Sequence, residues 1–129
     1  MSGQRDESLV MDDIVDAAQR LAELGGRLEP TVHAPSRDVA DQLLWNLTVL
    51  GEAVKRLQPA TRARYQDVEW AAMAATRDVV VHHYEGVDWE IVIRIAQHEL
   101  PGALPRLREI LAALRAESDG GACASDPHD

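Results

Sequence analysis

The stretch SRDVADQLLWNLTVLGEAVKRL, residues 36–57, decides the fold class. Its apolar residues recur every three or four positions, at Val39, Leu43, Leu47, Leu50 and Val54, which is the spacing of one face of an α-helix. Ser36 can accept a hydrogen bond from a backbone N–H of the first turn, so it is a candidate N-cap. The pattern therefore predicts a long amphipathic helix, whose apolar face needs other helices to cover it.

Similar spacing on both sides of this stretch predicts further helices, at about residues 6–28, 59–65, 70–84, 88–100 and 103–116. Asp67 and Asp88 are candidate caps for two of them, and Pro101 and Pro105 are expected to interrupt or restart the helical run. No strand pattern competes, and short connections favour antiparallel neighbours. We therefore predict an all-α, up-and-down bundle of four to five helices.

Composition limits the class of protein. The chain has 129 residues, which suits one domain, expected over residues 1–116, followed by a disordered acidic tail at 117–129. No apolar run approaches the roughly 20 residues of a membrane span, and the first residues lack the apolar stretch of a signal peptide. The only cysteine, Cys123, has no partner for an internal disulfide, so a cytoplasmic location is expected.

The charge is unevenly distributed. The net charge of −9 argues against a general nucleic-acid binder. Residues 53–66, however, contain no acid and four bases, which are Lys55, Arg56, Arg62 and Arg64. This basic block could meet a phosphate backbone, although a solvated face at a helix corner explains it as well.

The stretch RDVVVHHY, residues 77–84, carries an arginine, an aspartate, two histidines and a tyrosine within eight positions. Charged groups are costly in a core unless they are paired. Such a cluster, directly after a mostly apolar helical segment, therefore indicates a functional site.

Helical geometry relates these side chains to one another. If residues 70–84 form one helix with about 100° per residue, Arg77 and Tyr84 lie on its apolar stripe. Asp78 and His82 are four residues apart, so the carboxylate can fix the imidazole tautomer. His82 lies about 140° around the helix from Arg77. The two converge only if the helix ends near His82 or if a second copy of the chain contributes its own motif.

A structural explanation also fits each residue of this stretch taken alone. Arg77 could bury its stem and pair with a carboxylate, the two histidines could be ordinary residues of a helix C-terminus, and Tyr84 could be a core residue. The sequence has no glycine-rich phosphate loop, no HExxH and no Cys/His pairing, so neither a metal nor another cofactor is expected.

The stretch RDVVVHHY resembles the Arg-x4-His-x-Tyr signature of the HEPN superfamily, in the form found in its HepT-like branch. Three further segments are similar to that branch: NLTVLGEAVKRL at 46–57, with Gly51, Glu52 and Ala53; the Trp-led run at 68–92; and LPGALPRL at 100–107. The likeness spans roughly residues 10–115 and is specific as a combination.

This resemblance implies a HEPN-like bundle that forms homodimers, with two motifs facing one cleft. It also implies a metal-independent ribonuclease toxin of a type VII-like toxin–antitoxin pair. Its antitoxin would be a small nucleotidyltransferase that adenylylates the motif tyrosine, here Tyr84. The residue after the motif arginine is often Asn in this family, and here it is Asp78.

RNA cleavage without a metal uses the 2′-OH as an internal nucleophile, so DNA should be inert. A histidine suits the proton transfers near neutral pH, and an arginine suits the charged phosphate. We assign these roles to His82 and Arg77, with Asp78 orienting His82 and Tyr84 positioning RNA. Further candidate RNA contacts are His83, Lys55, Arg56, Arg62 and Arg64.

Two other functions stay open. The net charge of −9 favours a non-catalytic partner subunit that holds the nucleotide or substrate of a nucleotidyltransferase. The intact set of Arg77, His82 and Tyr84 speaks against it, because docking alone does not require these residues. A simple structural dimerisation bundle is the third possibility.

Overall fold

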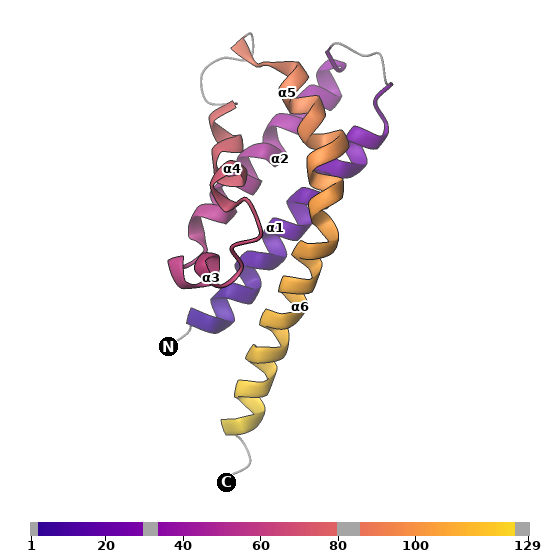
Figure 1. Cartoon of the computed structure of the whole chain (residues 1–129). Coiled ribbons are helices and arrows are strands. Elements are labelled where there is room, and N and C mark those ends of the chain that lie inside the picture. Colours follow the sequence, from indigo (N-terminus) through magenta and orange to yellow (C-terminus); the bar gives the residue numbers. More distant parts are fainter. Residues whose placement is uncertain (1–2, 30–33, 80–85, 126–129) are drawn as a thin grey trace.

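The computed structural model describes residues 3–29, 34–79 and 86–125, and all regular structure in this part of the chain is helical (Figure 1). Its elements are α1 (Gly3–Gly26), α2 (Arg37–Arg56), α3 (Pro59–Arg64), α4 (Trp70–Ala75), the 3-10 turn η1 (Thr76–Val79), α5 (Trp89–Arg94), the π-helical turn η3 (Ile95–Glu99) and α6 (Leu100–Ser125). The predicted all-α bundle is confirmed. None of the described helices is long and apolar enough to cross a membrane.

The core lies where α1 packs between α2 and α6 (Figure 1). Its fully buried side chains come from the apolar stripe of each long helix and include Ile14, Leu21, Leu43, Leu47, Leu50, Leu107 and Ile110. The short helix α4 and the turn η1 then pack against α2. This arrangement places residues 70–79 beside the stretch that predicted the fold.

Two predicted caps are confirmed. The Ser36 Oγ accepts from the Val39 N–H at 3.5 Å at the start of α2. The Asp88 carboxylate accepts from the N–H groups of Glu90 and Ile91 at 3.1 and 3.3 Å at the start of α5. Each carboxylate or hydroxyl satisfies N–H groups that a helix start leaves without a partner.

The prediction that Pro101 and Pro105 interrupt the helix is wrong. The helical run continues from α5 through η3 into α6, with Pro105 inside it. In η3 the Leu100 N–H donates to the Ile95 carbonyl, five residues back. A proline ring crowds the carbonyl four residues before it, and the wider π-helical turn directly ahead of Pro101 relieves that crowding.

The end of α6 also differs from the prediction. Residues 117–125 are helical here rather than a disordered tail, and residues 126–129 lie outside the described part. Glu117 forms an ion pair with Arg64, next to α3. This contact ties the helix beyond residue 116 to the rest of the bundle.

Candidate functional site

The segment that carries Arg77 does not continue α4 as an α-helix. The prediction of one helix over residues 70–84 is wrong for its middle part, because α4 ends at Ala75 and η1 follows as a 3-10 turn. The buried Thr76 hydroxyl lies 2.7 Å from the Met73 carbonyl oxygen and 3.3 Å from the Leu47 carbonyl oxygen of α2. Hydroxyl bonds to nearby carbonyls compete with regular helix geometry. The angular positions assigned with 100° per residue therefore do not apply beyond Thr76.

Gly51 on α2 makes room for this segment. A Cβ atom at Gly51 would lie 2.8 Å from the Arg77 Cβ, 2.9 Å from the Ala74 carbonyl oxygen and 3.1 Å from the Arg77 backbone nitrogen. Real Cβ atoms essentially never come within 3.0 Å of a non-bonded heavy atom, so the first two contacts could not form and the third would be unusually tight. Only glycine permits this approach, so Gly51 determines how near α2 the backbone of Arg77 lies.

The Arg77 side chain pairs with Glu52, the neighbour of Gly51. Arg77 Nη1 lies 2.6 Å from Glu52 Oε2, and the two side chains are 34% and 48% exposed. The structure thus shows the ion pair that was one of the two explanations of Arg77. The Arg77 side chain thus remains partly open to solvent, as contact with a phosphate would require.

The other predicted site residues have different outcomes. Asp78 is exposed and forms no ion pair with any residue that the structure describes. His82, His83 and Tyr84 lie outside the described residues. Their roles, and the contact of Asp78 with His82, therefore stay predictions.

The predicted basic block is partly engaged by acids. Arg56 Nη2 lies 3.0 Å from Asp13 Oδ2 on α1. Arg64 pairs with Glu117, and this hydrogen bond from the guanidinium lowers the pKa of the Glu117 carboxyl.

Lys55 and Arg62, the other two bases of the block, form no ion pair within the described part of the chain. The Arg56–Asp13 pair is exposed, and such pairs stabilise a fold by about 0–1 kcal/mol, so it would yield to a phosphate at little cost. Arg64 is held more firmly, because its two terminal nitrogens bond both oxygens of Glu117. Contact of these four bases with RNA stays a prediction.

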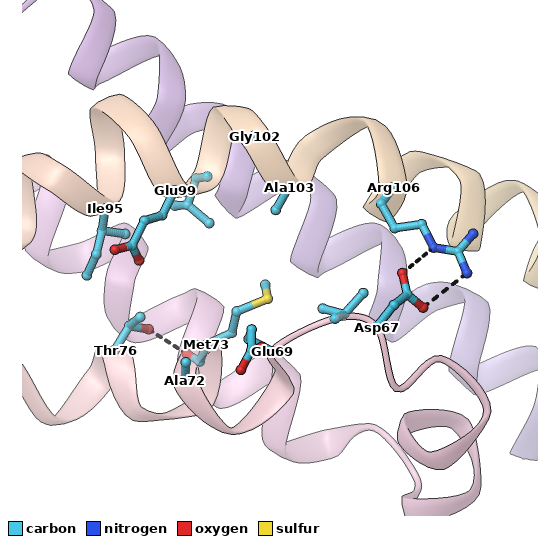
Figure 2. Close-up of a pocket in the computed structure, with 12 residues that line it drawn as sticks. Asp67, Glu69, Ala72, Met73, Thr76, Ile95, Glu99, Gly102, Ala103 and Arg106 are labelled. Atoms are coloured by element: carbon cyan, nitrogen blue, oxygen red, sulfur yellow. Dashed lines mark hydrogen bonds and ion pairs between the residues drawn. The ribbon is translucent and has the colours of Figure 1, made fainter.

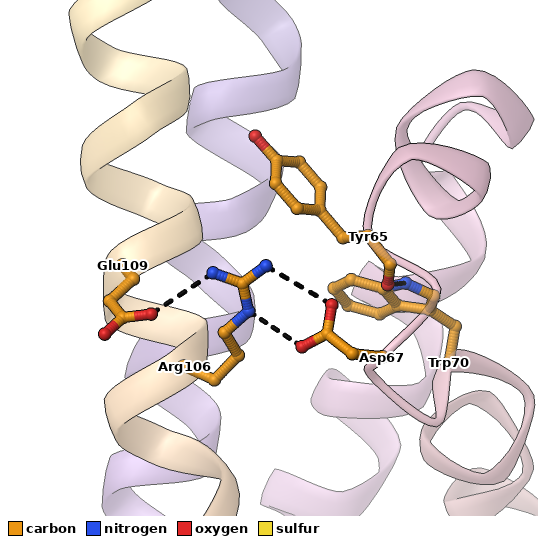
Figure 3. A network of polar contacts seen from close by, with 5 residues as sticks. All are labelled: Tyr65, Asp67, Trp70, Arg106 and Glu109. Atoms are coloured by element: carbon orange, nitrogen blue, oxygen red, sulfur yellow. Dashed lines mark hydrogen bonds and ion pairs between the residues drawn. The ribbon is translucent and has the colours of Figure 1, made fainter.

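Asp67 does not cap α4, contrary to the prediction, because Glu69 holds the N-cap position. The Asp67 carboxylate instead accepts hydrogen bonds from Arg106 Nε at 2.8 Å and from Arg106 Nη2 at 3.2 Å (Figure 3). These hydrogen bonds hold the pKa of Asp67 below its usual value. The guanidinium of Arg106 also bonds Glu109 at 3.2 Å and lies 5.5 Å from the centre of the Tyr65 ring. This network connects the chain ahead of α4 to α6.

A cavity of about 580 Å³ lies between α4 and the helical run from η3 into α6 (Figure 2). The Asp67–Arg106 pair bounds one end, and Thr76 and Glu99 line the other. Most of its walls are apolar, from Val68, Ala72, Met73, Ile95, Leu100 and Ala103. Among the described residues, no group of three or more His, Cys, Asp or Glu side chains could hold a metal ion.

Sequence reasoning missed Glu52 as the partner of Arg77. The similarity of residues 46–57 to the HepT-like branch included Glu52, but nothing in local spacing indicated which helix it faces. Gly51 was the available signal, because a glycine inside a helix is costly and indicates a close backbone approach.

The chain is similar to several known proteins. The family model "Ribonuclease HepT-like" matches residues 14–114. "Putative RNase MJ0127" of Methanocaldococcus jannaschii is 35% identical over 74 residues, which is 57% of this chain and 61% of that protein. "Putative RNase MJ1216" of the same organism is 23% identical over 116 residues, 90% of this chain and 96% of that protein. "Probable ribonuclease HepT" of Thermococcus cleftensis is 29% identical over 66 residues, 49% of this chain and 60% of that protein.

The chain thus spans about three fifths of the length of the first and third of these relatives, and nearly all of the second. No solved structure matches it.

Proposed function

Because the chain belongs to the HepT-like ribonuclease family, we propose that it is a metal-independent endoribonuclease and the toxin of a toxin–antitoxin pair. One observation of the structure supports this most: the partly exposed side chain of Arg77, just after α4, which pairs with Glu52 of α2. A planar fork of N–H donors is well suited to a phosphate that gains charge during the reaction.

In the proposed reaction the 2′-oxygen of RNA attacks the adjacent phosphorus and loses its proton. The bond from phosphorus to the 5′-oxygen breaks, and the 5′-oxygen takes up a proton. The products are a 2′,3′-cyclic phosphate and a 5′-hydroxyl. His82 would serve as the general acid/base, Arg77 would stabilise the charged phosphate, and Asp78 would orient His82.

A test of this chemistry uses the purified full chain, total RNA and a chelator. Replacing Arg77 or His82 by alanine should lower the cleavage rate on the order of 10²-fold or more, with the fold retained by circular dichroism. Activity that survives His82→Ala, or that disappears with the chelator, would contradict the mechanism. A chain that cleaves no RNA but binds its nucleotidyltransferase would instead be the non-catalytic partner subunit.

The active form is proposed to be a homodimer, in which a second copy brings its motif to the same cleft. Trp45 on α2 is 68% exposed, and it lies seven residues before Glu52, on the same face of the helix. Light scattering should give a mass near twice 14.2 kDa, and Trp45→Glu should lower it if this face lies in the dimer interface. A strictly monomeric wild-type chain that cleaves RNA would refute the dimer.

The antitoxin is proposed to be a small nucleotidyltransferase that modifies Tyr84. The phenolic oxygen of Tyr84 attacks the α-phosphorus of ATP, loses its proton and displaces pyrophosphate. The added AMP carries negative charge, which would compete with RNA for Arg77. Intact-mass measurement after co-expression should show added AMP in the wild type and none in Tyr84→Phe. A fully inhibited but unmodified complex would leave only steric masking.

A further inference from the structure

We propose that Glu52 is a positioning residue for Arg77: its carboxylate holds one edge of the guanidinium and leaves the rest to bind the RNA phosphate. This inference rests on the proposed ribonuclease function. It adds a residue of α2 to a site that the motif alone places entirely within residues 77–84.

The segment around Arg77 meets α2 at two points. The Thr76 hydroxyl lies 3.3 Å from the Leu47 carbonyl oxygen. One turn further along α2, a Cβ at Gly51 would lie 2.8 Å from the Arg77 Cβ. This packing brings Glu52, the residue after Gly51, within reach of the Arg77 side chain.

The ion pair engages one edge of the guanidinium. Nη1 lies 2.6 Å from Glu52 Oε2, whereas a guanidinium carries five N–H donors in a rigid fork. The side chain is 34% exposed, so donors beyond this contact can reach a ligand. A carboxylate on one edge and a phosphate on the other would hold the planar group between them.

Without Glu52, the Arg77 side chain would not keep a single orientation. An arginine side chain has many rotamers, and a partly exposed one samples several of them. Exposed ion pairs contribute little to fold stability, so the effect of Glu52 should fall on the geometry of the site. Fixing a catalytic group in its productive position before the reaction raises the rate of the chemical step.

The opposite role is competition, in which Glu52 occupies Arg77 and RNA must displace it. The two roles differ in kinetics. A positioning residue acts on kcat, and its loss slows cleavage. A competitor acts on RNA affinity, and its loss lowers KM.

The first experiment measures cleavage of a fluorogenic RNA by the full chain. Glu52→Ala should lower kcat about tenfold or more, with KM changed by less than about twofold. Glu52→Gln should recover part of that loss, because its amide oxygen can accept a hydrogen bond from the guanidinium. The control Asp12→Ala removes the acid of another exposed ion pair, 3.0 Å from Arg115, and should leave both constants unchanged. An unchanged kcat, or a lowered KM alone, in Glu52→Ala would overturn the inference.

The second experiment does not depend on activity. The Arg77 Nε–Hε signal, assigned with Arg77→Lys, should show restricted motion by ¹⁵N relaxation in the wild type and in Asp12→Ala, and fast motion in Glu52→Ala. Equal mobility in wild type and Glu52→Ala would overturn the inference even if RNA is cleaved. Restricted motion in a chain that cleaves no RNA would support the hold on Arg77 and refute the ribonuclease function.

Discussion

Replacing Gly51 by alanine tests the packing that holds the candidate site together. The new methyl group would lie 2.8 Å from the Arg77 Cβ and 2.9 Å from the Ala74 carbonyl oxygen. Neither atom can turn away by a side-chain rotation, because one is a backbone oxygen and the other is bonded directly to the backbone. The whole segment from α4 into η1 must therefore move away from α2.

Two opposing terms decide the size of the effect. Alanine is favoured over glycine inside a helix by about 1 kcal/mol. Overpacking a buried contact costs about 1–3 kcal/mol, and two contacts with unyielding atoms place Gly51→Ala towards the upper end. We expect a net loss of about 1–2 kcal/mol in the free energy of unfolding.

Gly102→Ala is the matched control. Gly102 lies inside α6, and a Cβ there meets nothing within 4 Å. The same substitution should stabilise the protein by up to about 1 kcal/mol. Urea unfolding of both variants measures the difference, which should reach about 2–3 kcal/mol. Equal stability of the two variants would refute the close approach of α2 to Arg77. On the proposed function, Gly51→Ala should also lose cleavage activity under conditions where it is folded, whereas Gly102→Ala should keep it.

The remaining predictions concern the scaffold. Gly25→Ala should destabilise the protein in thermal unfolding, because its Cβ would lie 2.6 Å from a backbone oxygen of η3, whereas Gly26→Ala, with nothing within 4 Å, should not. The pKa of Asp67 is lowered by the hydrogen bonds from Arg106, so the stability lost in Asp67→Asn should be constant above the unfolded-chain pKa of about 3.9 and should disappear as the pH falls from there through the lower pKa of the folded state. The exposed Pro105 lies inside the continuous helix α6 and has no N–H to donate there, so Pro105→Ala should raise the free energy of unfolding by about 1–3 kcal/mol; an unchanged value would mean that the helix has adapted fully to the proline.

The parts of the fold that followed from sequence depend on local interactions. Ser36 and Asp88 cap helices through groups two or three residues away, so the pattern alone identifies them. Asp67 has the same chemistry and a similar position ahead of a helix, yet it pairs with Arg106 from α6. Only the packing of α6 beside the loop decides between these two uses of one carboxylate, and local spacing does not contain that information.

The candidate site, like the fold, could be predicted from the sequence only where it depends on local interactions. Arg77 could be singled out because a charged group in a mostly apolar helical pattern needs an explanation. Its carboxylate partner could not be identified, since Glu52 is remote in sequence and acids occur in α1, α2, α5 and α6 alike. The change from α-helix to 3-10 turn at Thr76 could not be predicted from the sequence either, because it depends on a hydrogen bond from the Thr76 hydroxyl to a carbonyl of α2.

Gly51 and Glu52 make different contributions that depend on each other. An interior glycine lowers helix stability by about 0.5–1 kcal/mol relative to alanine, and the exposed ion pair beside it adds little in return. Neither residue is therefore explained by the stability of α2. Both are explained by Arg77, because Gly51 lets its backbone approach and Glu52 then meets its side chain. Alanine at residue 51 would make α2 more stable as a helix by itself. Only glycine, however, lets α2 place the Arg77 guanidinium where a phosphate could bind.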